Sequence, residues 1–190
     1  MFDRLLKMGE IGRRYFVLNS FDGVLTVLGI VMGSFVSGVE NPFIVFTAGL
    51  GASIALGISG FSSAYLTEKA ERRQDVLKIE EQMLEKVDGV WRDEKINKLP
   101  FKISLVNGLS PFVWGIFCLM PFILSILRIV NMKFSYYFSI VLSLVALMFL
   151  GFFLGKVSKR DKIITSFKML VVGFITMLIL YLLRFFGLGQ

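Results

Sequence analysis

Five long apolar stretches divide the chain, and most charged residues lie in the segments between them. The stretches cover residues 17–37, 43–65, 104–127, 134–155 and 163–187. Each is close to the roughly 20 residues that a helix needs to cross the hydrocarbon core of a bilayer. A membrane barrel would instead show short strands in which apolar and polar residues alternate. The pattern therefore predicts an all-α polytopic membrane protein with five transmembrane helices.

The charged segments divide the chain into four predicted parts. We expect a cytoplasmic amphipathic segment at residues 1–16, two transmembrane helices in 17–65, a charged cytoplasmic insert at 66–103, and three transmembrane helices in 104–187. Apolar side chains recur at helical spacing through the first part of the insert. The second transmembrane helix is therefore expected to continue into the insert, as far as residue 91.

Basic residues predict how these helices are oriented. Four, nine and four Lys or Arg residues lie in the N-terminal segment, the insert and the loop 156–162, against three in the other loops and the C-terminal end. Cytoplasmic loops are enriched in basic residues, so the N-terminus and the insert are expected in the cytoplasm and the C-terminus outside. The net charge of +7 then reflects orientation in the cell membrane, with the lipid bilayer rather than nucleic acid as the partner.

The residue types restrict the metal chemistry. The sequence has no histidine and a single cysteine, Cys118, which lies in an apolar stretch. The commonest transition-metal ligand is therefore missing, and no disulfide can form within one chain. Carboxylates, hydroxyls, amides, Met sulfur and backbone oxygens remain, a set that suits Mn²⁺ or Fe²⁺. We expect no prosthetic group.

Asp22 is a carboxylate near the start of the first apolar stretch. About five residues, or roughly 7 Å of helix rise, separate it from the predicted membrane edge. A charge at the centre of a membrane helix costs about 2.5–3.5 kcal/mol on insertion scales, and less near the interface. Two interpretations stay open. Asp22 either reaches out to the headgroups or is a buried ligand and proton carrier for a cation that crosses the membrane.

Small residues recur every four positions in the first two predicted helices. Gly29 and Gly33 form one such pair, and Gly49, Ser53 and Gly57 continue the spacing in the second helix. Stripes of this kind let helix backbones approach closely. The stripes predict either ordinary packing within one chain or a homodimer seam built on the first two transmembrane helices.

The acids of the insert also allow two interpretations. The insert holds nine acids and nine bases, which is typical of a solvated helix with ion pairs at i,i+4. Alternatively, Glu68 and Glu71 on one helix face, and Glu81 and Glu85 on another, form oxygen-rich clusters that suit divalent ions. Metal loading at these four glutamates is the second interpretation.

Several of these residues resemble the motifs of the vacuolar iron transporter family. The segment Phe21-Asp22-Gly23-Val24-Leu25-Thr26, followed by Gly29 and Gly33, is similar to that family's first-helix motif of Asn-Asp-Gly, a Thr and a glycine. The resemblance implies five spans with a cytoplasmic insert, and export of Fe²⁺ and Mn²⁺ from the cytosol. It also implies that Asp22 corresponds to the family's membrane-embedded aspartate, which takes part in metal and proton movement.

The sequence departs from the family pattern in the second helix. Ser59 and Tyr65 match that pattern, but Gly60 stands where the family has methionine and Ala64 where it has glutamate. The insert is also shorter than the family's three-helix metal-binding domain. The resemblance is therefore to a divergent member of the family.

These observations predict a divalent metal cation transporter of the Fe²⁺/Mn²⁺ class that exports ions by proton exchange through Asp22. Thr26, Ser59 and Ser62 are the expected pathway residues, and a second copy of the chain is the expected partner. The alternative is a membrane scaffold or regulator that keeps the fold without the metal pathway. A membrane enzyme is disfavoured, because a two-metal site needs several carboxylates and Asp22 stands alone within the predicted spans.

Overall fold

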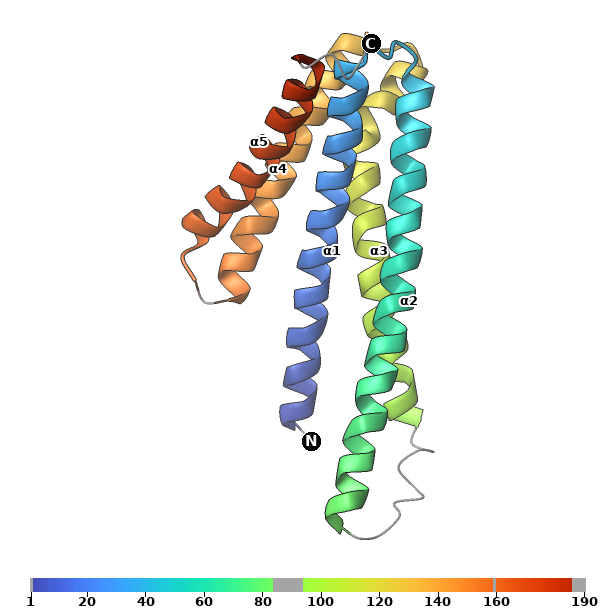
Figure 1. Cartoon of the computed structure of the whole chain (residues 1–190), viewed down its shortest axis with the longest axis vertical. Coiled ribbons are helices and arrows are strands. Elements are labelled where there is room, and N and C mark those ends of the chain that lie inside the picture. Colours follow the sequence, from blue (N-terminus) through green and yellow to red (C-terminus); the bar gives the residue numbers. More distant parts are fainter. Residues whose placement is uncertain (1, 84–93, 159, 186–190) are drawn as a thin grey trace.

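A computed structural model describes residues 2–83, 94–158 and 160–185, and these residues form five α-helices and no strand (Figure 1). The helices are α1 (Phe2–Val36), α2 (Pro42–Met83), α3 (Glu94–Ile126), α4 (Met132–Val157) and α5 (Lys162–Phe185). Each contains a segment long and apolar enough to cross a membrane. The predicted all-α fold with five transmembrane helices is therefore confirmed.

Helix α1 lies at the centre of the bundle and contacts each of the other four helices. The most extensive packing joins α2 to α3, while α4 and α5 form a second pair (Figure 1). Successive helices run in opposite directions, so the turns from α1 to α2 and from α3 to α4 lie at one end. The turn from α4 to α5 and the start of α1 point to the other end.

Two helices continue well beyond the predicted spans. Helix α1 runs from Phe2 to Val36, so residues 2–16 of the N-terminal segment continue into the first span without a break. Helix α2 has 42 residues, or roughly 63 Å of rise, against the ~30 Å of a bilayer core. It thus continues into the insert as predicted, and residues 84–91 of that prediction lie outside the described residues.

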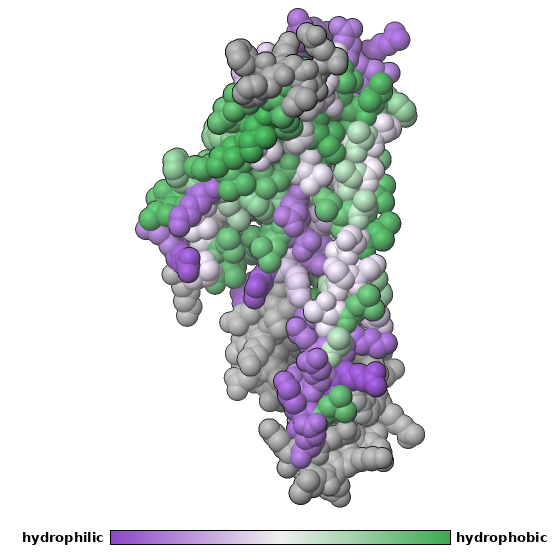
Figure 2. All heavy atoms as spheres, viewed as in Figure 1, coloured by the Kyte–Doolittle hydropathy of each residue, from purple (hydrophilic) through white to green (hydrophobic). Residues whose placement is uncertain are grey.

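The core is formed where α1 packs against α3 and α4. Its fully buried side chains are apolar on all three helices: Val24, Val27, Leu28, Val31, Leu119, Phe122, Leu147 and Leu150. In contrast, large apolar side chains on the outer face of the bundle are exposed. In Figure 2, apolar side chains cover a broad region of the upper half, and hydrophilic side chains gather at the lower end and the extreme top. This distribution is typical of an integral membrane protein.

The stripe of small residues on α2 packs within the chain. A Cβ added to Gly57 would lie 2.8 Å from the carbonyl oxygen of Gly108, and one added to Gly49 would lie 2.7 Å from a Leu119 methyl carbon. Helices α2 and α3 therefore approach so closely at Gly57 that a side chain would collide with backbone, while at Gly49 the Leu119 side chain fills the space. Of the two interpretations of this stripe, packing within one chain is the one that the structure supports.

Candidate functional site

Asp22 lies on a face of α1 that the other helices leave open. Its side chain is exposed, as is that of Leu18 one turn earlier. A Cβ added to Gly29 or Gly33 would meet no atom within 4 Å. Positions 18, 22, 29 and 33 fall on one side of a helix, since they are spaced by whole turns. We call this side, which also carries the half-buried Thr26, the open face of α1.

Gly23 fixes the direction in which Asp22 points. A Cβ added to Gly23 would lie 2.6 Å from Pro111 Cα and 2.8 Å from the Pro111 carbonyl oxygen. The backbones of α1 and α3 are thus in direct contact at this point. Because neighbouring residues of a helix point about 100° apart, this contact turns the Asp22 side chain away from α3 and onto the open face.

The predicted pathway residues on α2 are also exposed. Ser59 and Ser62 lie at the surface of the chain, whereas Gly57 and Phe61 of the same helix face α3. Thr26 lies one turn beyond Asp22 on α1. Within the described residues no hydrogen bond joins Asp22 to Thr26, Ser59 or Ser62. The structure therefore places these polar groups on the outer sides of two neighbouring helices without assembling them into one closed site.

Two asparagines join α1, α2 and α3 beside this face. The Asn19 amide nitrogen donates to the Tyr15 carbonyl oxygen at 3.1 Å and to Asn107 Oδ1. Asn107 is buried and donates in turn to the Gly60 carbonyl oxygen at 2.6 Å. A Cβ added to Gly60 would lie 3.3 Å from Asn19 Oδ1. We call this group, Asn19, Asn107 and Gly60, the asparagine clamp.

Sequence reasoning did not single out the asparagine clamp as a site. The available signal was two amide side chains inside apolar stretches, which is unusual because polar groups in a membrane need partners. The two asparagines are separated by 88 positions, so their pairing required the fold. Gly60, one member of the clamp, is the position at which the sequence resemblance expects a methionine.

The acids predicted at the insert differ in their exposure, and the structure describes three of the four. Glu68 is buried, with 4% of its side chain exposed, while Glu71 and Glu81 are exposed. Glu85 lies outside the described residues. Among the residues that the structure describes, no three Cys, Asp or Glu side chains come close enough to share a metal ion. Metal loading at these glutamates therefore stays a prediction.

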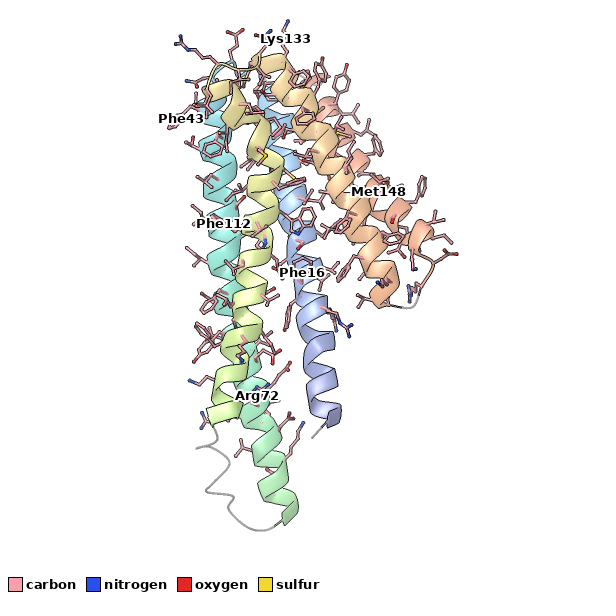
Figure 3. The ribbon with its side chains drawn as sticks, turned by 180° about the vertical axis from the view of Figure 1, so that it is seen from behind. Phe16, Phe43, Arg72, Phe112, Lys133 and Met148 are labelled. Carbon is pink, nitrogen blue, oxygen red and sulfur yellow. The ribbon has the colours of Figure 1, made fainter. Side chains whose placement is uncertain are left out.

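Arg72 lies one turn beyond Glu68 on α2, at the level where α2 and α3 extend below the α4–α5 pair (Figure 3). The residue is half-buried, and its Nε atom has no hydrogen-bond partner among the residues that the structure describes. The spacing of four residues places Glu68 and Arg72 next to each other on the helix surface. This pair of opposite charges marks the point where α2 leaves its apolar part.

Comparisons with known proteins show which sequences this chain is similar to. A family model described as the VIT family matches residues 73–184, which include part of the insert and the last three helices. An uncharacterized protein of Methanocaldococcus jannaschii is 33% identical over 176 residues, covering 90% of this chain and 87% of that protein. The family match does not include Asp22, whereas the similarity to the archaeal sequence extends over most of the chain.

Proposed function

Because this chain belongs to the VIT family, we propose that it exports divalent cations of the Fe²⁺ and Mn²⁺ class from the cytosol in exchange for protons. Transport of metal ions across a membrane is the general activity that family membership implies, and it favours a transporter over an enzyme. We propose in addition the identity of the transported ion, the direction of transport and its coupling to protons. In this proposal Asp22 is the residue that exchanges the metal ion for a proton.

The position of Asp22 is the observation that carries this proposal. A carboxylate exposed on an apolar span is unfavourable against lipid, so it is expected to face water, a cation or another protein surface. A carboxylate oxygen is a suitable ligand for a divalent cation. Binding a cation and binding a proton are competing ways to neutralise the same charge. One acid can therefore couple the outward movement of a metal ion to the inward movement of protons.

A second copy of the chain would cover the open face of α1. Gly29, Gly33 and Gly51 each have open space where a side chain would project, and small residues of this kind allow close packing of membrane helices. A two-fold arrangement brings the same surface of both copies together. The two Asp22 carboxylates would then line one seam, with Thr26, Ser59 and Ser62 as neighbouring oxygen ligands.

In the proposed orientation the protein spans the cell membrane and its insert faces the cytoplasm. The support is the excess of basic residues in the N-terminal segment, the insert and the loop 156–162. Glu68 and Glu71 would lie on the cytoplasmic side of the seam. Acids at that entrance would raise the local concentration of cations before they reach Asp22.

A membrane scaffold without transport is the second candidate function. It is favoured by Gly60 and Ala64, which replace the methionine and the glutamate that the resemblance expects in the metal pathway. Gly60 belongs to the asparagine clamp, and Ala64 is buried, with 2% of its surface exposed. Both positions serve packing between helices in this chain. The transport measurement below separates the two functions.

Uptake into proteoliposomes tests the proposed function. We expect saturable movement of Mn²⁺ and Fe²⁺, accompanied by proton movement in the opposite direction, when the purified full chain is reconstituted under a proton gradient. A dye for each ion inside the vesicles reports both fluxes. Protein-free vesicles give the background. Fluxes equal to that background for both metals would leave the scaffold as the remaining function.

Bulky side chains on the open face of α1 are expected to prevent dimer formation. Replacing Gly29 and Gly33 with leucine adds volume where the single chain has space, so the fold of each copy is preserved while the seam is blocked. We expect the dimer dissociation constant to rise by at least about tenfold, equivalent to ~1.4 kcal/mol, as measured by native mass spectrometry.

The substitution Gly12→Leu is the matched control, because this glycine of α1 also has no atom within 4 Å of an added Cβ and lies nearly three turns before Asp22. It is expected to leave the dimer unchanged. A wild-type protein that is monomeric at all concentrations, or a dimer that tolerates both leucines, would exclude this seam.

A further inference from the structure

The α4–α5 pair carries a cavity that the transport proposal does not use. It has a volume of about 800 Å³ and lies beside the turn between the two helices, within the size range of pockets that hold small molecules. Its walls are of two kinds. Leu154, Ile164 and Val172 are apolar, whereas Arg160, Asp161 and Lys168 are charged.

Lys168 is a cation in an unusual place. It lies within the apolar span of α5, six residues after the helix begins at Lys162, which corresponds to ~9 Å of rise. Its side chain is exposed. Side chains of a helix lean toward the N-terminus, which for α5 is the end that carries Arg160. The ammonium group can therefore reach back along the apolar wall toward Arg160.

Among the described residues that line this cavity the cations outnumber the acids, since Arg160 and Lys168 are accompanied by one carboxylate, that of Asp161. Within the described part of the chain, no carboxylate forms an ion pair with Arg160 or Lys168, although Asp161 lines the same cavity. Lys156 and Lys162 flank it and are exposed. An ionised side chain at membrane depth is normally paired with an opposite charge. Arg160 and Lys168 are therefore available to bind an anion in this cavity.

The backbone around the cavity is held firmly. A Cβ added to Gly151 would lie 2.5 Å from Ser166 Cα, and one added to Gly155 would lie 2.6 Å from Lys162 Cα. The Arg160 amide donates to the Gly155 carbonyl oxygen at 3.0 Å. The backbones of α4 and α5 are thus in direct contact beside the cavity. This contact limits the movement of the backbone segments that carry Arg160 and Lys168.

We propose that this cavity binds an anionic phospholipid, with its phosphodiester between Arg160 and Lys168 and an acyl chain along Ile164 and Val172. Basic pockets between membrane helices are suited to such headgroups. A soluble phosphate would use the two cations but not the apolar wall. A zwitterionic lipid would bring its own cation toward Arg160. This inference rests on the membrane-spanning fold and is independent of the transported ion.

Native mass spectrometry of the full chain in an equimolar mixture of phosphatidylglycerol and phosphatidylcholine tests the assignment. We expect the wild type to retain phosphatidylglycerol at least about tenfold more than phosphatidylcholine, because each surface cation attracts anionic lipid. The double variant Arg160→Gln/Lys168→Gln is expected to lose this preference. The charge-conserving variant Arg160→Lys/Lys168→Arg is expected to keep it.

The matched control, Arg128→Gln/Lys133→Gln, removes two exposed cations. Lys133 lies at the opposite end of the bundle (Figure 3), and Arg128 lies in the adjoining connection between α3 and α4. This variant is expected to retain the preference. Equal retention of both lipids by the wild type would overturn the proposal, even if a variant failed to fold. So would an unchanged preference in the double variant. Displacement of the lipid by an equal concentration of glycerol phosphate would assign the cavity to a soluble phosphate instead.

Discussion

Replacing Asp22 with asparagine is expected to reduce Mn²⁺ uptake in proteoliposomes to the rate of protein-free vesicles. Asparagine has nearly the same shape but carries no charge, so it can neither hold a divalent cation strongly nor exchange a proton. A fall of at least about a hundredfold is expected, since ~3 kcal/mol, the upper value for a hydrogen bond to a charged group, already corresponds to that factor. Metal flux and proton flux are expected to fall together.

The control for this variant is Glu40→Gln, which neutralises an exposed carboxylate in the connection between α1 and α2. It is expected to transport at the wild-type rate. The thermal midpoint of Asp22→Asn is expected to match that of the wild type, because the Asp22 side chain forms no hydrogen bond with the described residues. Transport by Asp22→Asn at the wild-type rate would remove this residue from the mechanism.

The number and order of the helices could be predicted from hydropathy, whereas the residues at which they begin and end could not. In lipid every backbone polar group must be satisfied within the segment, so a long apolar stretch has few alternatives to a helix. Outside the hydrocarbon that constraint is lost. The start of α3 at Glu94, ten residues before its predicted span at 104, lies in such a region, and so does the continuous α1 from Phe2. Local helix propensity and packing decide those ends.

The candidate site shows a similar division between local and non-local information. The motif around Asp22 could be identified in the sequence, because its residues are neighbours. Spacing alone could not distinguish the stripe containing Gly57, which packs on α3, from the pair Gly29 and Gly33, which remains open. The asparagine clamp depends on residues 88 positions apart. Such contacts arise from the arrangement of whole helices and leave no periodic signal.

The largest stability effect is expected from Gly23→Ala. The added methyl carbon would lie 2.6 Å from Pro111 Cα, and both the Cα and the carbonyl oxygen that it meets belong to the backbone of α3. Backbone cannot rotate aside as a flexible side chain can, so α1 and α3 must separate. Overpacking of this kind costs about 1–3 kcal/mol. We therefore expect the thermal midpoint of the purified protein to fall by several degrees.

The change is also expected to lower transport, because moving α1 displaces the adjacent Asp22 from its position on the open face. Gly12→Ala is the matched control on the same helix, since its added carbon would meet no atom within 4 Å. Alanine is a better helix former than glycine by ~1 kcal/mol, so this variant is expected to be as stable as the wild type or slightly more stable. If Gly23→Ala and Gly12→Ala melted at the same temperature, the close contact between α1 and α3 would not exist in the protein. The direction assigned to Asp22 would then lose its structural basis.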